Sequence, residues 1–179
     1  MKSLRTAVII GSTREGRAGE GVATWCATHA TGRSTLDVDL VDLAAYSFPE
    51  RHPRSPTPAM TALTGRLAVA EAFVVVTPEY NRSFPAALKQ AIDFAYDEWH
   101  AKPVGFVSYG CASTGLYAVE QLRGVFAGLH TVTMRDAVGI DLLRGGPGDA
   151  DLVALDTLLD HLTWWGLALR DARELRGTP

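Results

Sequence analysis

Residues 11–21 bring hydroxyl and guanidinium groups into a glycine-rich segment. The segment follows the short apolar run 6–10, which is too short for a helix and predicts a buried strand. It contains four glycines, and a helix is predicted to begin at its end, near Gly21 or Val22. Its hydroxyl and guanidinium groups belong to Ser12, Thr13, Arg14 and Arg17.

This combination predicts a phosphate-binding loop. The first N–H groups of a helix have no partner within the helix, and the helix dipole favours an anion at that end. Hydroxyl groups can donate hydrogen bonds to phosphate oxygens, and a guanidinium adds a forked, charge-assisted contact.

Two common phosphate-binding patterns fit this loop poorly. The dinucleotide pattern G-x-G-x-x-G fails because Ser12 and Thr13 follow Gly11. The pattern G-x-x-x-x-G-K-[ST] of nucleoside triphosphatases matches both glycines. However, Arg17 replaces its lysine and Ala18 replaces the hydroxyl residue that binds Mg²⁺. A triphosphatase is therefore the poorer alternative, and the single phosphate of a mononucleotide fits better.

A second polar loop, residues 77–85, also follows a buried strand. The strand is predicted over the apolar residues 72–76, and a helix carrying Leu88 and Ile92 on one face follows the loop. The loop presents an aromatic ring, an amide and a guanidinium from Tyr80, Asn81 and Arg82. Open α/β sheets bind ligands in loops of this kind, outside the carboxyl ends of their strands.

The rest of the chain continues the alternation of strands and helices. Further strands are predicted at 36–43, 103–109 and 131–138, and further helices at 59–71, at 115–129 and from Asp149 or Asp151 onward. This pattern predicts an α/β fold, a three-layer αβα sandwich around a five-stranded parallel sheet. The flavodoxin-like strand order 2-1-3-4-5 is the expected topology.

That strand order brings three loops together. The first, third and fourth strands are neighbours, so loops 11–21, 77–85 and 109–115 are expected to meet at one end of the sheet. The first loop suits a phosphate, and the other two offer Tyr80 and Tyr109 beside free backbone groups. We therefore predict a site for a phosphorylated ligand that carries a flat ring with a polar edge.

Composition predicts one domain over residues 1–179. The chain is 47% hydrophobic, which is enough for one full core. The net charge of −3 gives no basic surface for nucleic acid, and no apolar run is long enough for a membrane span or a secretion signal. Two cysteines predict no disulfide framework, which indicates the cytoplasm, and the scattered histidines predict no metal site.

The chain resembles the NADPH-dependent FMN reductase family, a flavodoxin-like group that includes quinone, azo-dye and chromate reductases. Three segments carry the resemblance: Gly11-Ser12-Thr13-Arg14, residues 78–85 (PEYNRSFP) with 88–93 (LKQAID), and Ser108-Tyr109-Gly110 with Ser113-Thr114-Gly115. The chain departs from the family's usual pattern where Arg17 and Gly19 replace a serine and an asparagine. It departs again at Cys111, where a glycine is common.

The resemblance implies a bound FMN that takes hydride from NADPH or NADH and reduces a second small molecule. That acceptor would be free flavin, a quinone, an azo compound or a metal oxyanion. Because the cofactor carries the chemistry, no catalytic side chain is implied. The implied phosphate contacts are Ser12, Thr13, Arg14, Arg17 and Gly19. The implied ring contacts are Pro78, Glu79, Tyr80, Asn81, Ser108, Tyr109, Gly110 and Cys111.

The resemblance also implies a homodimer or homotetramer. The alternative is a flavodoxin-type electron carrier without NAD(P)H activity of its own. Such carriers tend to be strongly acidic and lack the P-E-Y-N loop, whereas this chain is only mildly acidic and has Pro78 to Asn81.

Overall fold

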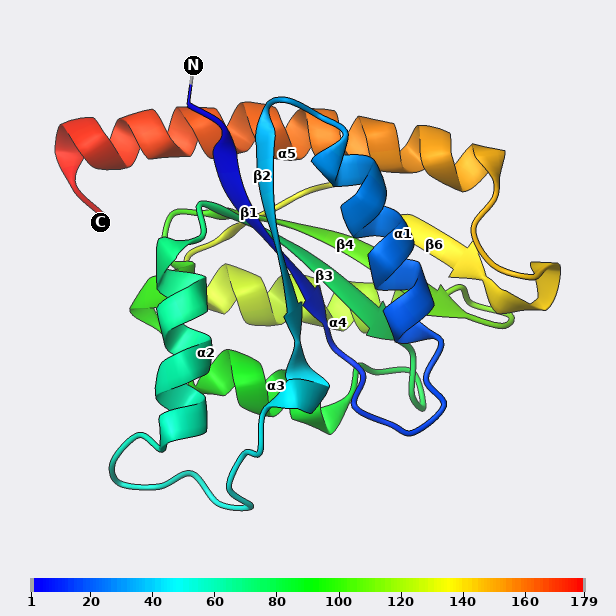
Figure 1. Cartoon of the computed structure of the whole chain (residues 1–179), viewed down its shortest axis with the longest axis horizontal. Helices are drawn as coiled ribbons and strands as arrows, with labels where there is room; N and C mark the ends of the chain where they lie inside the picture. The colour runs from blue at the N-terminus through cyan, green and yellow to red at the C-terminus, as the bar shows by residue number, and fades with distance from the viewer. Residues whose placement is uncertain (1, 179) are drawn as a thin grey trace.

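The computed structural model describes residues 2–178 as a central parallel sheet with helices on both faces (Figure 1). The strands are β1 Leu4–Ile10, β2 Leu36–Asp42, β3 Ala72–Pro78, β4 Pro103–Gly110, β5 Val132–Thr133 and β6 Val138–Asp141. The helices are α1 Gly19–Thr31, α2 Pro58–Val69, α3 Ala86–Asp93, α4 Leu116–Gly128 and α5 Asp149–Arg176. Single 3₁₀ turns cover Leu43–Ala45, Asp97–Trp99 and Leu142–Arg144.

The strand order is β2-β1-β3-β4-β5, and β6 also pairs with β4. The predicted fold class and order 2-1-3-4-5 are therefore confirmed, but the sheet has six strands instead of five. The predicted strand at 131–138 is interrupted in its middle. The two pieces, β5 and β6, pair with β4 in registers that differ by two residues, so the chain between them leaves the sheet. In this break the guanidinium of Arg123 on α4 donates to the carbonyl oxygens of Met134 and Arg135.

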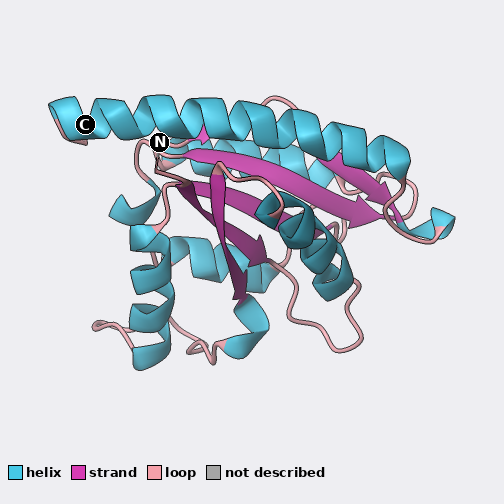
Figure 2. Ribbon diagram, turned by 45° about the horizontal axis from the view of Figure 1, so that its top comes forward, coloured by secondary structure: helices cyan, strands magenta, loops and turns pink. Residues whose placement is uncertain are grey.

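Apolar side chains on the two faces of the sheet form two cores. On one face, Val22 of α1 and Leu158 of α5 pack against the sheet. On the other face, α2, α3 and α4 contribute Leu63, Ile92 and Phe126. All seven residues of β3 are buried, as expected for a central strand covered on both faces. Figure 2 shows α5 running along the length of the sheet.

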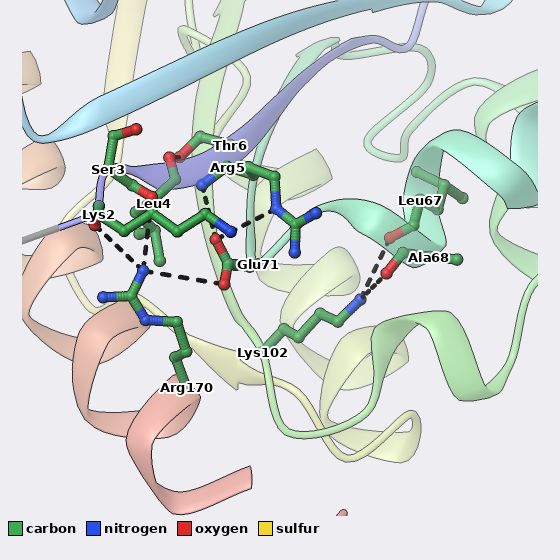
Figure 3. A network of polar contacts seen from close by, with 10 residues as sticks. All are labelled: Lys2, Ser3, Leu4, Arg5, Thr6, Leu67, Ala68, Glu71, Lys102 and Arg170. Carbon is green, nitrogen blue, oxygen red and sulfur yellow. Dashed lines mark hydrogen bonds and ion pairs between the residues drawn. The ribbon is translucent and has the colours of Figure 1, made fainter. Parts of the chain in front are cut away.

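A polar network joins the amino ends of the strands to α5 and α2 (Figure 3). The buried Glu71 carboxylate accepts a 2.9 Å hydrogen bond from the Arg5 N–H and lies 3.9 Å from the Arg170 guanidinium on α5. Lys102, also buried, donates from Nζ to the carbonyl oxygens of Leu67 and Ala68, both at 3.2 Å. It thereby satisfies carbonyl groups at the end of α2, which have no partner within the helix. The opposite end of the sheet carries the polar loops.

Candidate functional site

The three polar loops meet at the carboxyl ends of β1, β3 and β4, and each pair of loops is in contact. The Tyr109 hydroxyl donates a 3.0 Å hydrogen bond to Ser12 Oγ, which joins the loops after β4 and β1. The Glu79 N–H donates to the Tyr109 carbonyl oxygen at 3.3 Å. The Arg14 guanidinium lies 5.8 Å from the centre of the Tyr80 ring. The convergence that the strand order predicts is therefore present.

The loop after β1 leaves the start of α1 without a side-chain cap. Ala18 is the N-cap residue, so it offers no acceptor to the first N–H groups of the helix. Thr13 and Arg14 are exposed beside this helix end. A phosphate monoester requires donors such as uncapped N–H groups, a hydroxyl and a guanidinium. Within residues 2–178 the Arg14 guanidinium has no acidic side chain paired with it.

Ser12 and Gly19 lie deeper than their neighbours in the loop. Ser12 is fully buried, and its hydroxyl accepts from Tyr109, which leaves its own proton free for another acceptor. A Cβ atom on Gly19 would lie 2.3 Å from the Tyr109 hydroxyl oxygen and 2.7 Å from Ser12 Oγ. A side chain at position 19 would therefore force the Tyr109 or Ser12 side chain to shift, because the helix start packs directly against this pair. Burial raises the pKa of Tyr109, so the phenol stays protonated at neutral pH.

Arg17 points away from the exposed side of the loop, toward the end of β2. Its guanidinium donates to both carboxylate oxygens of Asp42, at 2.6 and 2.5 Å, and to the Ser12 carbonyl oxygen at 2.5 Å. The hydrogen bonds between Arg17 and Asp42 raise the pKa of Arg17 and lower the pKa of Asp42, so the pair stays ionised at neutral pH. The structure thus gives Arg17 a protein partner, Asp42, that the local sequence pattern does not reveal.

The loop after β3 contains a tight two-residue turn. Tyr80 and Ser83 exchange backbone hydrogen bonds of 2.8 and 3.0 Å across the turn. The central residues, Asn81 and Arg82, both have positive φ angles, 52° and 64°, as in a type I′ turn. Asparagine adopts this conformation readily, whereas arginine does so at a cost of about 1 kcal/mol.

Helix α4 holds that turn in place. The Gln121 amide donates to the Arg82 carbonyl oxygen at 2.8 Å and accepts from the Ser83 hydroxyl at 2.6 Å. The Glu79 carboxylate accepts from the Tyr117 N–H at 3.1 Å, and so caps the start of α4 from outside the helix. Gln121 and Tyr117 are not recognisable as site residues from the sequence, because partners 38 and 39 residues away leave no local pattern.

The loop after β4 completes the site with a buried hydroxyl and an exposed thiol. Ser108 is buried and donates to the Thr114 carbonyl oxygen at 2.8 Å, which closes the loop on itself. Gly115 follows with a φ of +90°, a conformation that glycine adopts without strain. Cys111 is exposed at the tip of the loop, and Gly110 is half-buried beside it.

The three loops thus bring an uncapped helix start, hydroxyl groups and the exposed Arg14 guanidinium close to two tyrosines and several backbone groups. This set of groups fits FMN. Within residues 2–178 no group of three or more histidine, cysteine or acidic side chains is arranged to hold a metal ion. None of the helices described there, including the 28-residue α5, has the length and apolar character needed to cross a membrane. The donors present suit an anionic phosphate and a flat ring, and a cofactor would carry the chemistry.

The chain belongs to the NADPH-dependent FMN reductase family, whose sequence pattern matches residues 4–142. This match includes all three loops of the site.

Individual relatives agree with this assignment. A 2-hydroxy-1,4-benzoquinone reductase of a Burkholderia species is 34% identical over 146 residues, which cover 74% of this chain and 75% of the relative. An NAD(P)H-dependent FMN reductase of Schizosaccharomyces pombe is 36% identical over 112 residues, 58% of this chain. The match spans a little over half of that relative's length, 56%.

A solved structure shares the fold. The flavoenzyme NAD(P)H:(acceptor) oxidoreductase FerB of Paracoccus denitrificans superposes with a TM-score of 0.74 at 24% identity. The superposition covers 92% of this chain and 98% of FerB.

Proposed function

We propose that the chain is an FMN-dependent NAD(P)H oxidoreductase. The observation that carries this proposal is the meeting of three loops around an uncapped helix start and the exposed guanidinium of Arg14. A bound FMN would supply the redox chemistry, in which a hydride from NADPH or NADH is accepted and two electrons pass to a second substrate. The names of the relatives favour an enzyme over a flavodoxin-type electron carrier.

We assign the phosphate to the first loop and the ring to the other two. Arg14 supplies the charge-assisted contact, and the N–H groups in the first turn of α1, which begins at Gly19, face the anion. The hydroxyl groups of Ser12 and Thr13 donate hydrogen bonds to it. Along the ring we place Pro78, Glu79, Tyr80 and Asn81 on one side, and Ser108, Tyr109, Gly110 and Cys111 at the pyrimidine edge. Donors at that edge stabilise the negative charge that the flavin gains on reduction.

We propose a quinone or free flavin as the second substrate, with azo compounds and metal oxyanions as further acceptors. The reductases named for the Burkholderia and S. pombe relatives support this choice. The site contributes a platform for a flat ring and no side chain that must react, which suits a broad acceptor range.

We further propose that residues 1–179 form one domain that assembles as a homodimer or homotetramer in the cytoplasm. The two cores flank one sheet, which supports a single domain. Both cysteines are free thiols, which supports a reducing compartment.

Anaerobic absorbance spectroscopy tests the proposed activity. Protein loaded with FMN is mixed with NADPH, and in a parallel sample with NADH, and then with benzoquinone. We expect at least one nicotinamide to bleach the flavin absorbance within seconds, and benzoquinone to restore it. Flavin that binds but responds to neither nicotinamide would contradict the proposal and favour an electron carrier.

A further inference from the structure

Arg17 links three parts of the phosphate-loop region through one guanidinium. It lies near the end of the loop after β1 and bonds to the Ser12 carbonyl oxygen at the start of the same loop. It also donates hydrogen bonds to both carboxylate oxygens of Asp42, the last residue of β2. The Arg17 side chain is only 11% exposed, so these charge-assisted contacts are partly shielded from water.

The surrounding backbone makes such a link useful. Backbone hydrogen bonds anchor the two ends of the loop, from Gly11 N–H to Val76 and from Val22 N–H to Ala18. Between these anchors Gly16 has a φ of +63° and the loop is largely exposed. A flexible loop loses conformational entropy when it closes on a ligand, and a tether reduces that loss.

The charges around the loop also support a structural role for Arg17. The Asp42 carboxylate lies beside a loop that is proposed to hold a phosphate dianion, and an unpaired carboxylate there would repel it. Arg17 neutralises Asp42, whereas Arg14 is exposed and forms no ion pair with any residue from 2 to 178. The two arginines therefore have different surroundings despite being three residues apart.

We propose that Arg17 is a positioning residue, which holds the phosphate loop in its binding shape through Asp42 and leaves the phosphate contact to Arg14. This inference rests on the proposed function, because it concerns the phosphate of the same cofactor.

Flavin affinities of Arg17→Gln, Asp42→Asn and the double variant test this role. The Ala44 N–H donates to the Asp42 carboxylate at 3.0 Å, and the amide oxygen of an asparagine can still accept this hydrogen bond. Asp42→Asn therefore removes only the negative charge and one acceptor oxygen. We expect each single variant to weaken FMN binding by about 10-fold or more, and the double variant to bind no more weakly than the singles. Riboflavin, which lacks the phosphate, should bind all variants as it binds the unmodified protein.

Arg66→Gln serves as the matched control. Arg66 forms a similar fork with Asp39 on the same strand, but it comes from α2 and lies outside the three loops. We expect this variant to bind FMN with unchanged affinity.

Two results would overturn the inference. If Asp42→Asn binds FMN as tightly as the unmodified protein, or more tightly, Arg17 acts on the phosphate directly. If riboflavin affinity falls as much as FMN affinity, the pair has only a general structural role.

Amide hydrogen exchange without flavin separates this inference from the proposed function. We expect Asp42→Asn to speed exchange in residues 12–18 and leave β3 unchanged. If the unmodified protein binds no flavin, the proposed function fails, while this exchange difference still decides whether the tether exists. Unchanged exchange in the loop would refute the tether.

Discussion

The free energy of unfolding should rise between about pH 8 and pH 10, and replacing Lys102 with methionine should remove this rise. Lys102 is 8% exposed, and its ammonium donates to two carbonyl oxygens at 3.2 Å and lies 5.5 Å from the centre of the Phe73 ring. Burial, reinforced by the nearby positive charge of Arg173, lowers the pKa of Lys102 from its ordinary value of 10.5 to about 8. The folded protein therefore releases this proton at lower pH than the unfolded chain does.

The magnitude follows from the two pKa values of Lys102. Below pH 8 both states carry the proton, and the folded state bears the full cost of a buried charge. Between pH 8 and 10.5 the unfolded state binds more protons, so the free energy of unfolding rises with pH. A pKa difference of about 2.5 corresponds to a total rise of about 3 kcal/mol, most of which is reached by about pH 10.

Urea unfolding followed by far-UV circular dichroism at pH 7, 8, 9 and 10 measures this rise. Relative to Lys102→Met, the unmodified protein should gain about 2–3 kcal/mol across that range. Lys89→Met is the control, because Lys89 is a surface residue paired with Asp93 and should follow the unmodified profile. Parallel pH profiles for the unmodified protein and Lys102→Met would refute the reasoning.

Three further predictions concern the site. Arg14→Ala should weaken FMN binding by about 10- to 100-fold in calorimetry while riboflavin binding is unchanged, and equal losses for both flavins would contradict a phosphate contact. Gly19→Ala should lower the free energy of urea unfolding by about 1–3 kcal/mol, because the new methyl group collides with the tyrosine hydroxyl of β4. Gly21→Ala should not lower the free energy of unfolding, because a Cβ atom at position 21 meets nothing within 4 Å. Equal losses of stability in Gly19→Ala and Gly21→Ala would contradict the collision at position 19. Cys111 should react rapidly with Ellman's reagent, and bound FMN should slow this reaction. Cys26 is buried, which raises its pKa to about 12, and it should react only when the protein unfolds. A Cys111 rate that FMN leaves unchanged would remove this thiol from the ring's surroundings.

The strand order and the meeting of the loops were predictable because they follow from short-range patterns. Buried strands such as residues 72–76 are continuous apolar runs, and each is followed by a loop with recognisable turn and polar residues. Parallel topology then leaves few arrangements, so the loops after β1, β3 and β4 must be neighbours.

The contacts that shape the loops were not predictable in the same way. Asp42 lies 25 residues from Arg17, and only the register that pairs Ile10 with Asp42 brings this carboxylate to the loop. Gln121 similarly reaches the turn after β3 from another helix. The split of the last predicted strand reflects a two-residue change of register along β4, which no hydrophobic pattern reveals.

Titration of the purified protein with FMN, followed by quenching of flavin fluorescence, tests the central claim most directly. If the three loops form a cofactor site, quenching should saturate at one FMN per chain, and Arg14→Ala should shift the curve to higher FMN concentration. Absence of saturable quenching in the unmodified protein would contradict the proposed assignment of these loops.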